Sequence, residues 1–198
     1  IELSLGRHKI VGRDHQLPSG ITIQPEMGLS GGVYLEESAA LLGDWRDHPV
    51  FVVDGRCLPV VFRGITFKDF NLSCGPYQGV GNPIFEVNGG TLEFRQCHFV
   101  NHFKTAVWFE GGIGRFYDCE FEGGRGAASA IHFAGSELTL ENCVFRDNAW
   151  LQDCGELVGS VLRLMSGTIA MNDSRFIDNG PLIHLVTIEP EAVLDACT

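Results

Sequence analysis

Polar and aromatic side chains recur at the centre of short apolar triplets, and several of them are of types that carry chemistry. The central residues, in chain order, are Thr22, Val52, Glu86, Trp108, His132, Arg163 and His184. A second set, two residues further along, is Asp54, Asn88, Glu110, Ala134 and Met165. Glu86 and Glu110 could form an acid/base pair if their surroundings gave the two carboxyl groups different pKa values. Trp108 could stack on a sugar ring, and Arg163 could hold a carboxylate.

These positions allow three interpretations. Carboxylates on neighbouring strands can reach the separation of a retaining glycosidase, which permits a catalytic site. The residues that would carry catalysis are Glu86, Glu110, His132 and Arg163. The residues that would instead line a ligand-binding face are Trp108, Glu86, Asn88, His132, Arg163 and His184. The third interpretation is plain surface, because strand positions that face water are polar by default.

Strands are the elements that would position these residues. Successive side chains of a strand point to opposite faces, so the outer residues of Val107-Trp108-Phe109 and Ile131-His132-Phe133 would point inward. The central residues would point outward. Stacking of the triplets at about 4.8 Å would align the central residues in one column on a first sheet.

A degenerate repeat of roughly 21–34 residues explains how such triplets stack. In each copy, two apolar residues separated by one polar residue are followed by a Cys or Ser and then by a Phe. The clearest copies are 92–99, 114–121, 138–145 and 169–176. One such unit cannot bury its apolar face alone, so the sequence predicts an all-β solenoid, a single parallel β-helix of roughly seven to eight coils.

The repeat extends over most of the chain, so we expect one domain over residues 1–198. The segment 24–50 is expected to be a long excursion from the coils, with a short helix over 35–42. The chain begins without Met and ends at the start of another repeat, which favours a fragment of a longer chain. Its ends would then meet further coils or other protein chains.

Composition and charge limit the classes of partner that the chain is expected to bind. A hydrophobic content of 44% is enough for one sizeable core, and a formal net charge of −11 opposes binding to nucleic acid. No apolar run approaches the roughly 18 residues of a membrane span, so no membrane insertion is expected. The histidines and cysteines lack the spacing of metal ligands, and we expect neither a metal nor a cofactor.

Four of the seven cysteines share one position of the repeat. We predict that they form an inward stack of small apolar thiols. These residues are Cys97, Cys119, Cys143 and Cys197. The other three fall in turns or loops and could form a disulfide in an oxidising compartment. They are Cys57, Cys74 and Cys154.

Asparagines mark two further features. The pattern Phe-x-x-Asn at 145–148 and 176–179 predicts that Asn148 and Asn179 stack as a ladder that caps backbone groups at a turn. Glycosylation sequons begin at Asn71 and Asn172. Asn71 lies at an expected turn and could carry a glycan, whereas Ser174 of the second sequon would point inward.

The segments 17–23 and 62–70 resemble opening coils of the right-handed parallel β-helix superfamily, the pectin-lyase-like proteins. The Phe-x-x-Asn pattern, with the Gly-Gly-Thr-Leu of 89–92, resembles the repeats of polymorphic outer membrane proteins and related surface β-helices. The resemblance implies a right-handed parallel β-helix, a fold that hosts lyases, hydrolases, epimerases, adhesins and scaffolds.

The characteristic catalytic motifs of the pectate lyases, polygalacturonases and mannuronan epimerases are absent from the sequence. We therefore expect a non-catalytic structural or adhesive segment of a larger extracellular or cell-surface assembly. The alternatives are a polysaccharide-active enzyme (a lyase, hydrolase or epimerase) and a carbohydrate-binding module that uses the outer face of the first sheet. Carboxyl groups that converge in a cleft would favour the enzyme, and an aromatic face without that convergence would favour the binding module.

Overall fold

The computed structural model describes residues 2–3, 6–10, 15–18, 20–25, 33–37, 49–54, 58–70, 83–102, 105–125, 128–148, 160–180, 183–185 and 192–194. These residues form strands and turns, with no helix among them. The strands belong to three sheets, and every recorded strand pair is parallel.

We number the sheets in the order in which the chain visits them from β3 onward. Sheet 1 contains β3 (His15–Leu17), β6 (Phe51–Asp54), β9 (Phe85–Gly89), β12 (Val107–Phe109), β15 (Ala128–Phe133), β18 (Ser160–Leu164) and β21 (Ile183–Leu185). Sheet 2 contains β1 (Glu2–Leu3), β4 (Thr22–Pro25), β7 (Val60–Arg63), β10 (Thr91–Arg95), β13 (Ile113–Tyr117), β16 (Glu137–Glu141), β19 (Thr168–Asn172) and β22 (Ala192–Leu194). Sheet 3 contains β2 (Gly6–Ile10), β5 (Val33–Glu37), β8 (Ile65–Lys68), β11 (His98–Val100), β14 (Glu120–Glu122), β17 (Val144–Arg146) and β20 (Arg175–Ile177).

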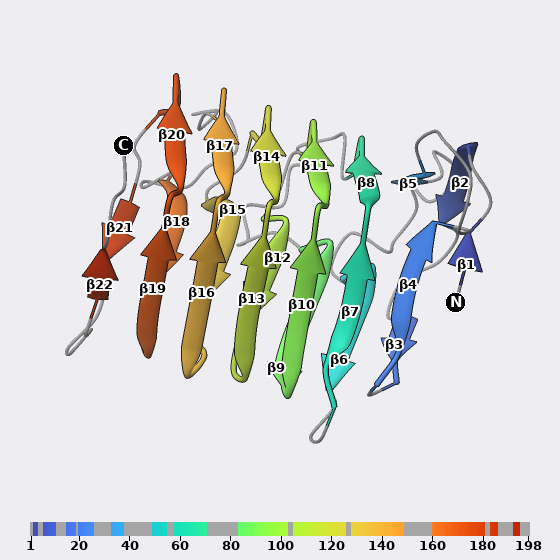
Figure 1. Cartoon of the computed structure of the whole chain (residues 1–198), viewed down its shortest axis with the longest axis horizontal. Coiled ribbons are helices and arrows are strands. Elements are labelled where there is room, and N and C mark those ends of the chain that lie inside the picture. The colour runs from blue at the N-terminus through green and yellow to red at the C-terminus, as the bar shows by residue number, and fades with distance from the viewer. Residues whose placement is uncertain are drawn as a thin grey trace, which may run out of the picture.

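Within each sheet the strands follow one another in chain order, and they lie side by side along the long axis of the molecule (Figure 1). One strand from each sheet makes up one rung of the stack. The predicted all-β class and the stacking of parallel strands are therefore confirmed, in an arrangement consistent with a parallel β-solenoid. The described residues include no apolar helix of membrane-spanning length.

Phenylalanine side chains form much of the core. Along sheet 3, Phe67, Phe99, Phe121, Phe145 and Phe176 stack with centroids of adjacent rings between 4.7 and 5.0 Å apart. The first four are fully buried. Each inward ring therefore packs on the rings of the rungs above and below, which adds offset stacking to the burial of apolar area.

Residues with positive φ angles form the corners. In successive rungs, the residue that follows the sheet 2 strand is Gly64, Gln96, Asp118, Asn142 or Asp173. The left-handed conformation favours Gly, Asn and Asp, which explains the recurrent polar residue here. From β10 onward two residues make this corner, and the second is the buried Cys97, Cys119, Cys143 or Ser174. The return from sheet 3 to sheet 1 varies in length, over 101–106, 123–127, 147–159 and 178–182.

The predicted inward thiol stack is confirmed for Cys97, Cys119 and Cys143, whereas Cys197 lies outside the described residues. The predicted asparagine ladder is also formed. Asn148 Nδ2 donates to the Phe121 carbonyl at 2.9 Å, and Asn179 Nδ2 donates to the Phe145 carbonyl at 2.7 Å. Both side chains thus satisfy backbone groups at the end of sheet 3.

Two positional predictions are wrong. Thr22 does not belong to the sheet 1 column, because it pairs with Val61 in sheet 2, and Gln16 is the residue in register with Val52. Within the segment 24–50, expected to leave the coils, residues 33–37 form β5, which pairs with β2 and β8 in sheet 3, so the prediction is wrong over these residues; residues 26–32 and 38–48 lie outside the described residues. The expected helix is therefore wrong over 35–37, and residues 38–42 lie outside the described residues.

Candidate functional site

The outer face of sheet 1 carries the column that the sequence predicted. Its residues occupy matching positions on neighbouring strands, in the order Val52, Glu86, Trp108, His132, Arg163 and His184. The flanking apolar residues of each triplet point into the core, as Val107, Phe109 and Ile131 do. The side chain of His184 lies outside the described residues.

Trp108 and His132 form the centre of this column. Their rings are stacked face to face, with centroids 3.6 Å apart and an interplanar angle of 6°. The indole Nε1–H donates to Glu110 Oε1 at 2.5 Å, so the tryptophan is held both by ring stacking and by a hydrogen bond. The imidazole is almost fully covered, although it stands on the water-facing side of the sheet.

Burial changes the acid–base behaviour of His132. Loss of water around the ring, together with the positive charge of Arg163 on the next strand, lowers the pKa of His132 to about 4. The imidazole is therefore neutral at pH 7. Within the described part of the chain, His132 Nδ1 and Arg163 Nε are buried without a hydrogen-bond partner.

The two carboxylates of the predicted acid/base pair have different partners. Glu86 Oε1 accepts a hydrogen bond from Asn88 Nδ2 at 3.1 Å, on the same strand. Glu110 accepts the hydrogen bond from the Trp108 indole. Each carboxylate is thus engaged by a neighbour two residues away, and both sites are open to solvent. The arrangement is an aromatic patch bordered by hydrogen-bond acceptors.

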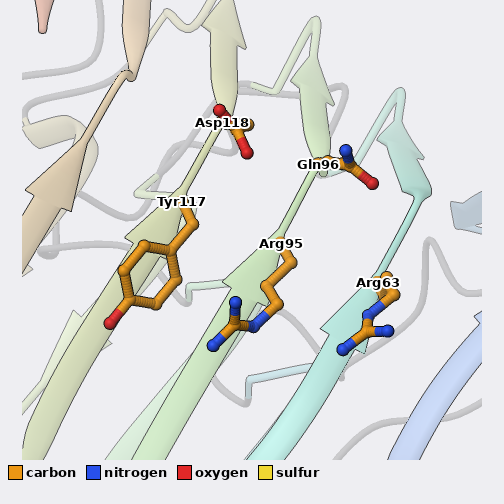
Figure 2. Close-up of a pocket in the computed structure, with 5 residues that line it drawn as sticks. All are labelled: Arg63, Arg95, Gln96, Tyr117 and Asp118. Atoms are coloured by element: carbon orange, nitrogen blue, oxygen red, sulfur yellow. The ribbon is translucent and has the colours of Figure 1, made fainter. Parts of the chain in front are cut away.

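Sheet 2 carries a pocket of about 230 Å³ on its outer face, at the corner towards sheet 3. Figure 2 shows its lining, which is Arg63, Arg95, Gln96, Tyr117 and Asp118. Arg95 Nε donates to Glu93 Oε1 at 2.5 Å, and its guanidinium carbon lies 4.5 Å from the centroid of the Tyr117 ring. The hydrogen bond to Glu93 is the main cause that raises the pKa of Arg95 above its ordinary value.

The sequence analysis missed this pocket. Arg63, Arg95 and Tyr117 are in register as the last residues of β7, β10 and β13. Alignment of the repeats by their apolar residues would have placed the three in one column. None of the three is of the acid/base or metal-ligand types that single out a site in a sequence.

A third polar group lies on the outer face of sheet 3. His98 Nε2 is 3.2 Å from Glu122 Oε2 and 3.7 Å from Glu120 Oε2, and one ligand atom from each residue lies within 4.8 Å of the others. Such a set could contact one metal ion, although the sequence predicted no metal site. Arg146 Nη2 lies 2.7 Å from Glu120 Oε1 and already neutralises part of the negative charge. The hydrogen bond between His98 and Glu122 and the ion pair between Arg146 and Glu120 account for the cluster.

Several predicted positions lie outside the described residues. They are the glycosylation candidate Asn71 and the cysteines Cys57, Cys74 and Cys154. In the second sequon, Ser174 is fully buried and its hydroxyl accepts a hydrogen bond from the Cys143 amide. That geometry opposes recognition of Asn172 as a glycan acceptor.

No family model, curated protein or solved structure matches this chain.

Proposed function

We propose that the chain is a non-catalytic adhesive segment of a larger extracellular or cell-surface assembly, and that it holds carbohydrate on the outer face of sheet 1. In this proposal the fold is a single right-handed parallel β-helix of the pectin-lyase-like kind, with roughly seven to eight coils whose ends meet further coils or other chains.

The observation that carries the proposal is the stack of Trp108 on His132. Because the imidazole covers one face of the indole at 3.6 Å, the other face is directed along the column towards Glu86. The indole is fixed by the stack and by its hydrogen bond to Glu110. A rigid aromatic ring loses little entropy when a ligand binds, which suits it to stacking on the apolar face of a sugar.

The polar groups around the indole suit hydroxyl recognition. Glu86 and Asn88 lie on β9, the strand on the side of the indole away from His132, and they are joined by a hydrogen bond of 3.1 Å. The carboxylate oxygens accept hydrogen bonds from sugar hydroxyls, and the amide can both donate and accept. Neutral His132 adds no positive charge that would compete for these acceptors.

A binding role is favoured over the polysaccharide-active alternative. A general acid must be protonated at working pH, whereas His132 has a pKa of about 4 and its ring face is covered by the indole. Glu86 and Glu110 are engaged with Asn88 and Trp108 rather than with each other. The geometry therefore supplies an aromatic platform and hydrogen-bond acceptors, as a binding module requires.

Affinity electrophoresis of the 198-residue chain in gels that contain neutral polysaccharides tests the proposal. The chain should be retarded, and Trp108→Ala should abolish the retardation. Trp108→Phe keeps an aromatic ring without the indole N–H and should retain part of it. Arg175→Gln, on the exposed start of β20 in sheet 3, serves as the control and should behave as the unaltered chain.

Two results would contradict the proposal. Retardation that is identical in the unaltered chain and in folded Trp108→Ala would remove the Trp108 platform from the argument. Release of reducing ends or unsaturated sugars by the chain, abolished in Glu86→Gln, would establish the polysaccharide-active alternative instead.

A further inference from the structure

The pocket on sheet 2 brings two arginines together without an evident structural reason. Arg63 and Arg95 are in register on the neighbouring parallel strands β7 and β10, whose backbones are about 4.8 Å apart. Figure 2 shows both guanidinium groups extended over the same face and in the same direction. Like charges directly opposite one another on neighbouring strands are destabilising.

A carboxylate of the protein neutralises the positive charge of one arginine of the pair, Arg95. Glu93 accepts a hydrogen bond from Arg95 Nε at 2.5 Å. Among the residues that the structure describes, no side chain forms a hydrogen bond or ion pair with the Arg63 guanidinium. An anion bound between the two guanidinium groups would remove their repulsion, and both would donate charge-assisted hydrogen bonds to it.

Arg95 is held in place before any ligand arrives. Its Nε atom donates a hydrogen bond to Glu93. The Tyr117 ring, whose centroid is 4.5 Å from the guanidinium carbon, belongs to β13, the neighbour of β10 on the side away from β7. The terminal Nη groups are therefore left for a ligand on the Arg63 side. A donor that is fixed by its neighbours costs less entropy to immobilise, which favours binding.

We propose that this pocket binds a sulfate ester carried by a sugar, with the sulfate bridging Arg63 and Arg95. One guanidinium fork already satisfies both oxygens of a carboxylate, whereas a tetrahedral oxyanion has three free oxygens for two forks. A sulfate ester carries one negative charge. A phosphate monoester carries about −1.5 to −2 at pH 7. Because Glu93 already neutralises Arg95 and Asp118 adds a negative charge, the lining that the structure describes offers one unpaired cation, Arg63, which matches the single charge of a sulfate ester.

The remaining lining indicates a sugar as the carrier. Gln96 offers an amide and Asp118 a carboxylate, which are groups that hydrogen-bond to hydroxyls. The volume of about 230 Å³ lies below the range of pockets that enclose drug-sized ligands, so the pocket suits one sugar residue. This site lies on a different sheet from Trp108 and does not depend on the function proposed for that face.

Isothermal titration calorimetry of the intact chain at low ionic strength tests the site, with a sulfated methyl glucoside as the probe. Unsulfated methyl glucoside, glucose phosphate, glucuronate and sulfotyrosine are the comparison ligands. The sulfated sugar should bind most tightly, and Arg63→Gln should weaken it by about tenfold or more, because one charge-assisted contact is lost. Arg175→Gln removes the same charge from sheet 3 and should leave the affinity unchanged.

Tyr117 provides a second, independent comparison. Tyr117→Phe keeps the ring under Arg95 and should bind the probe as the unaltered chain does. Tyr117→Leu removes the ring, frees the Arg95 guanidinium and should weaken binding several-fold, while Arg63 is still present. A loss in both variants would contradict the positioning role of the ring.

Four results would overturn the proposal. Equal affinities of Arg63→Gln and the unaltered chain would exclude the bridged site, and equal weakening by Arg175→Gln would reduce the binding to general surface charge. Tighter binding of glucose phosphate or glucuronate would exclude the sulfate ester. Tighter binding of sulfotyrosine would exclude the sugar as carrier. Loss of carbohydrate binding in Trp108→Ala would concern the outer face of sheet 1 and would not bear on the pocket of sheet 2.

Discussion

Replacement of Asn148 by Asp tests the turn ladder by exchanging a single functional group. Asn148 is fully buried, and its Oδ1 atom accepts a hydrogen bond from the Gly124 amide at 2.9 Å. Its Nδ2 group donates to the Phe121 carbonyl at 2.9 Å and to Asn179 Oδ1 at 3.0 Å. Asn148→Asp keeps the acceptor but replaces the donor by an oxygen that faces two other oxygens.

The magnitude follows from these contacts. At pH 7 the variant loses two hydrogen bonds and buries a carboxylate without a cation among its described contacts, which should lower the free energy of unfolding by about 3–5 kcal/mol. Burial and the facing oxygens raise the pKa of the new carboxyl in the folded protein above its unfolded value of about 3.9. Between the two pKa values the folded state binds more protons than the unfolded state.

The stability deficit must therefore grow as the pH rises. Below both pKa values the carboxyl is protonated in both states, and its O–H can donate to one of the facing oxygens. As the pH increases through the folded pKa, the free energy of unfolding should fall relative to the unaltered chain by up to about 1.4 kcal/mol per pH unit. Above the folded pKa the deficit should be constant.

Urea unfolding at a series of pH values from 4 to 7, followed by circular dichroism, measures this deficit directly. Asn172→Asp makes the same exchange at an exposed residue at the end of β19 and should show a small deficit at every pH. The reasoning would be refuted if Asn148→Asp matched the unaltered chain at pH 7, or if its deficit did not increase with pH.

Three further predictions address the column, the thiols and two glycines between sheets 1 and 2. His132 should titrate with a pKa of about 4 by NMR, so folding stability should be lost as the pH falls from 6.5, the ordinary pKa of histidine, towards 4. Trp108→Ala uncovers the imidazole and should raise the pKa of His132, and an unchanged pKa would contradict its origin in burial. Burial raises the pKa of the Cys119 thiol, and the hydrogen bond with Cys119, together with burial, raises the pKa of the Cys143 thiol. Iodoacetamide at pH 8 should therefore label both thiols in urea but not in the native chain, as mass spectrometry can show. Gly112 has a φ of 82°, and a Cβ added there would overlap the Gly90 carbonyl, so Gly112→Ala should lower the free energy of unfolding in urea by more than about 2 kcal/mol. A Cβ added at Gly89 meets open space, so Gly89→Ala should change the free energy of unfolding by less than about 1 kcal/mol, and equal effects would disprove the steric argument.

Strict alternation made the sheet 1 column predictable, because Glu86, Trp108 and His132 each lie between two apolar residues that face the core. The same alternation misplaced Thr22. Ile21-Thr22-Ile23 has the pattern of a triplet, and a period of two residues does not say which sheet a strand joins. Its sheet 1 counterpart, Gln16, has an apolar neighbour on one side alone, and that weaker pattern concealed it.

Local propensity also failed where long-range pairing decides the structure. Residues 35–37 contain good helix formers, yet they pair with β2 on one side and β8 on the other, and those backbone hydrogen bonds outweigh the propensity. The stack of Trp108 on His132 was not predictable either. The sequence aligned the two residues, but their contact depends on side-chain rotamers, and the resulting low pKa of His132 depends on that contact.

The unequal length of the return from sheet 3 to sheet 1 has a practical consequence for engineering. From β10 onward the corner between sheets 2 and 3 is always two residues, whereas the return ranges from 123–127 to 147–159, and the triplets 107–109, 131–133 and 162–164 nevertheless stay in register. The added free energy of closing a longer loop is only about 0.6 kcal/mol per doubling of its length. Short foreign peptides grafted at this one edge would therefore leave the triplets of sheet 1 in register, and a row of such grafts would display short epitopes at a spacing of about 4.8 Å per rung.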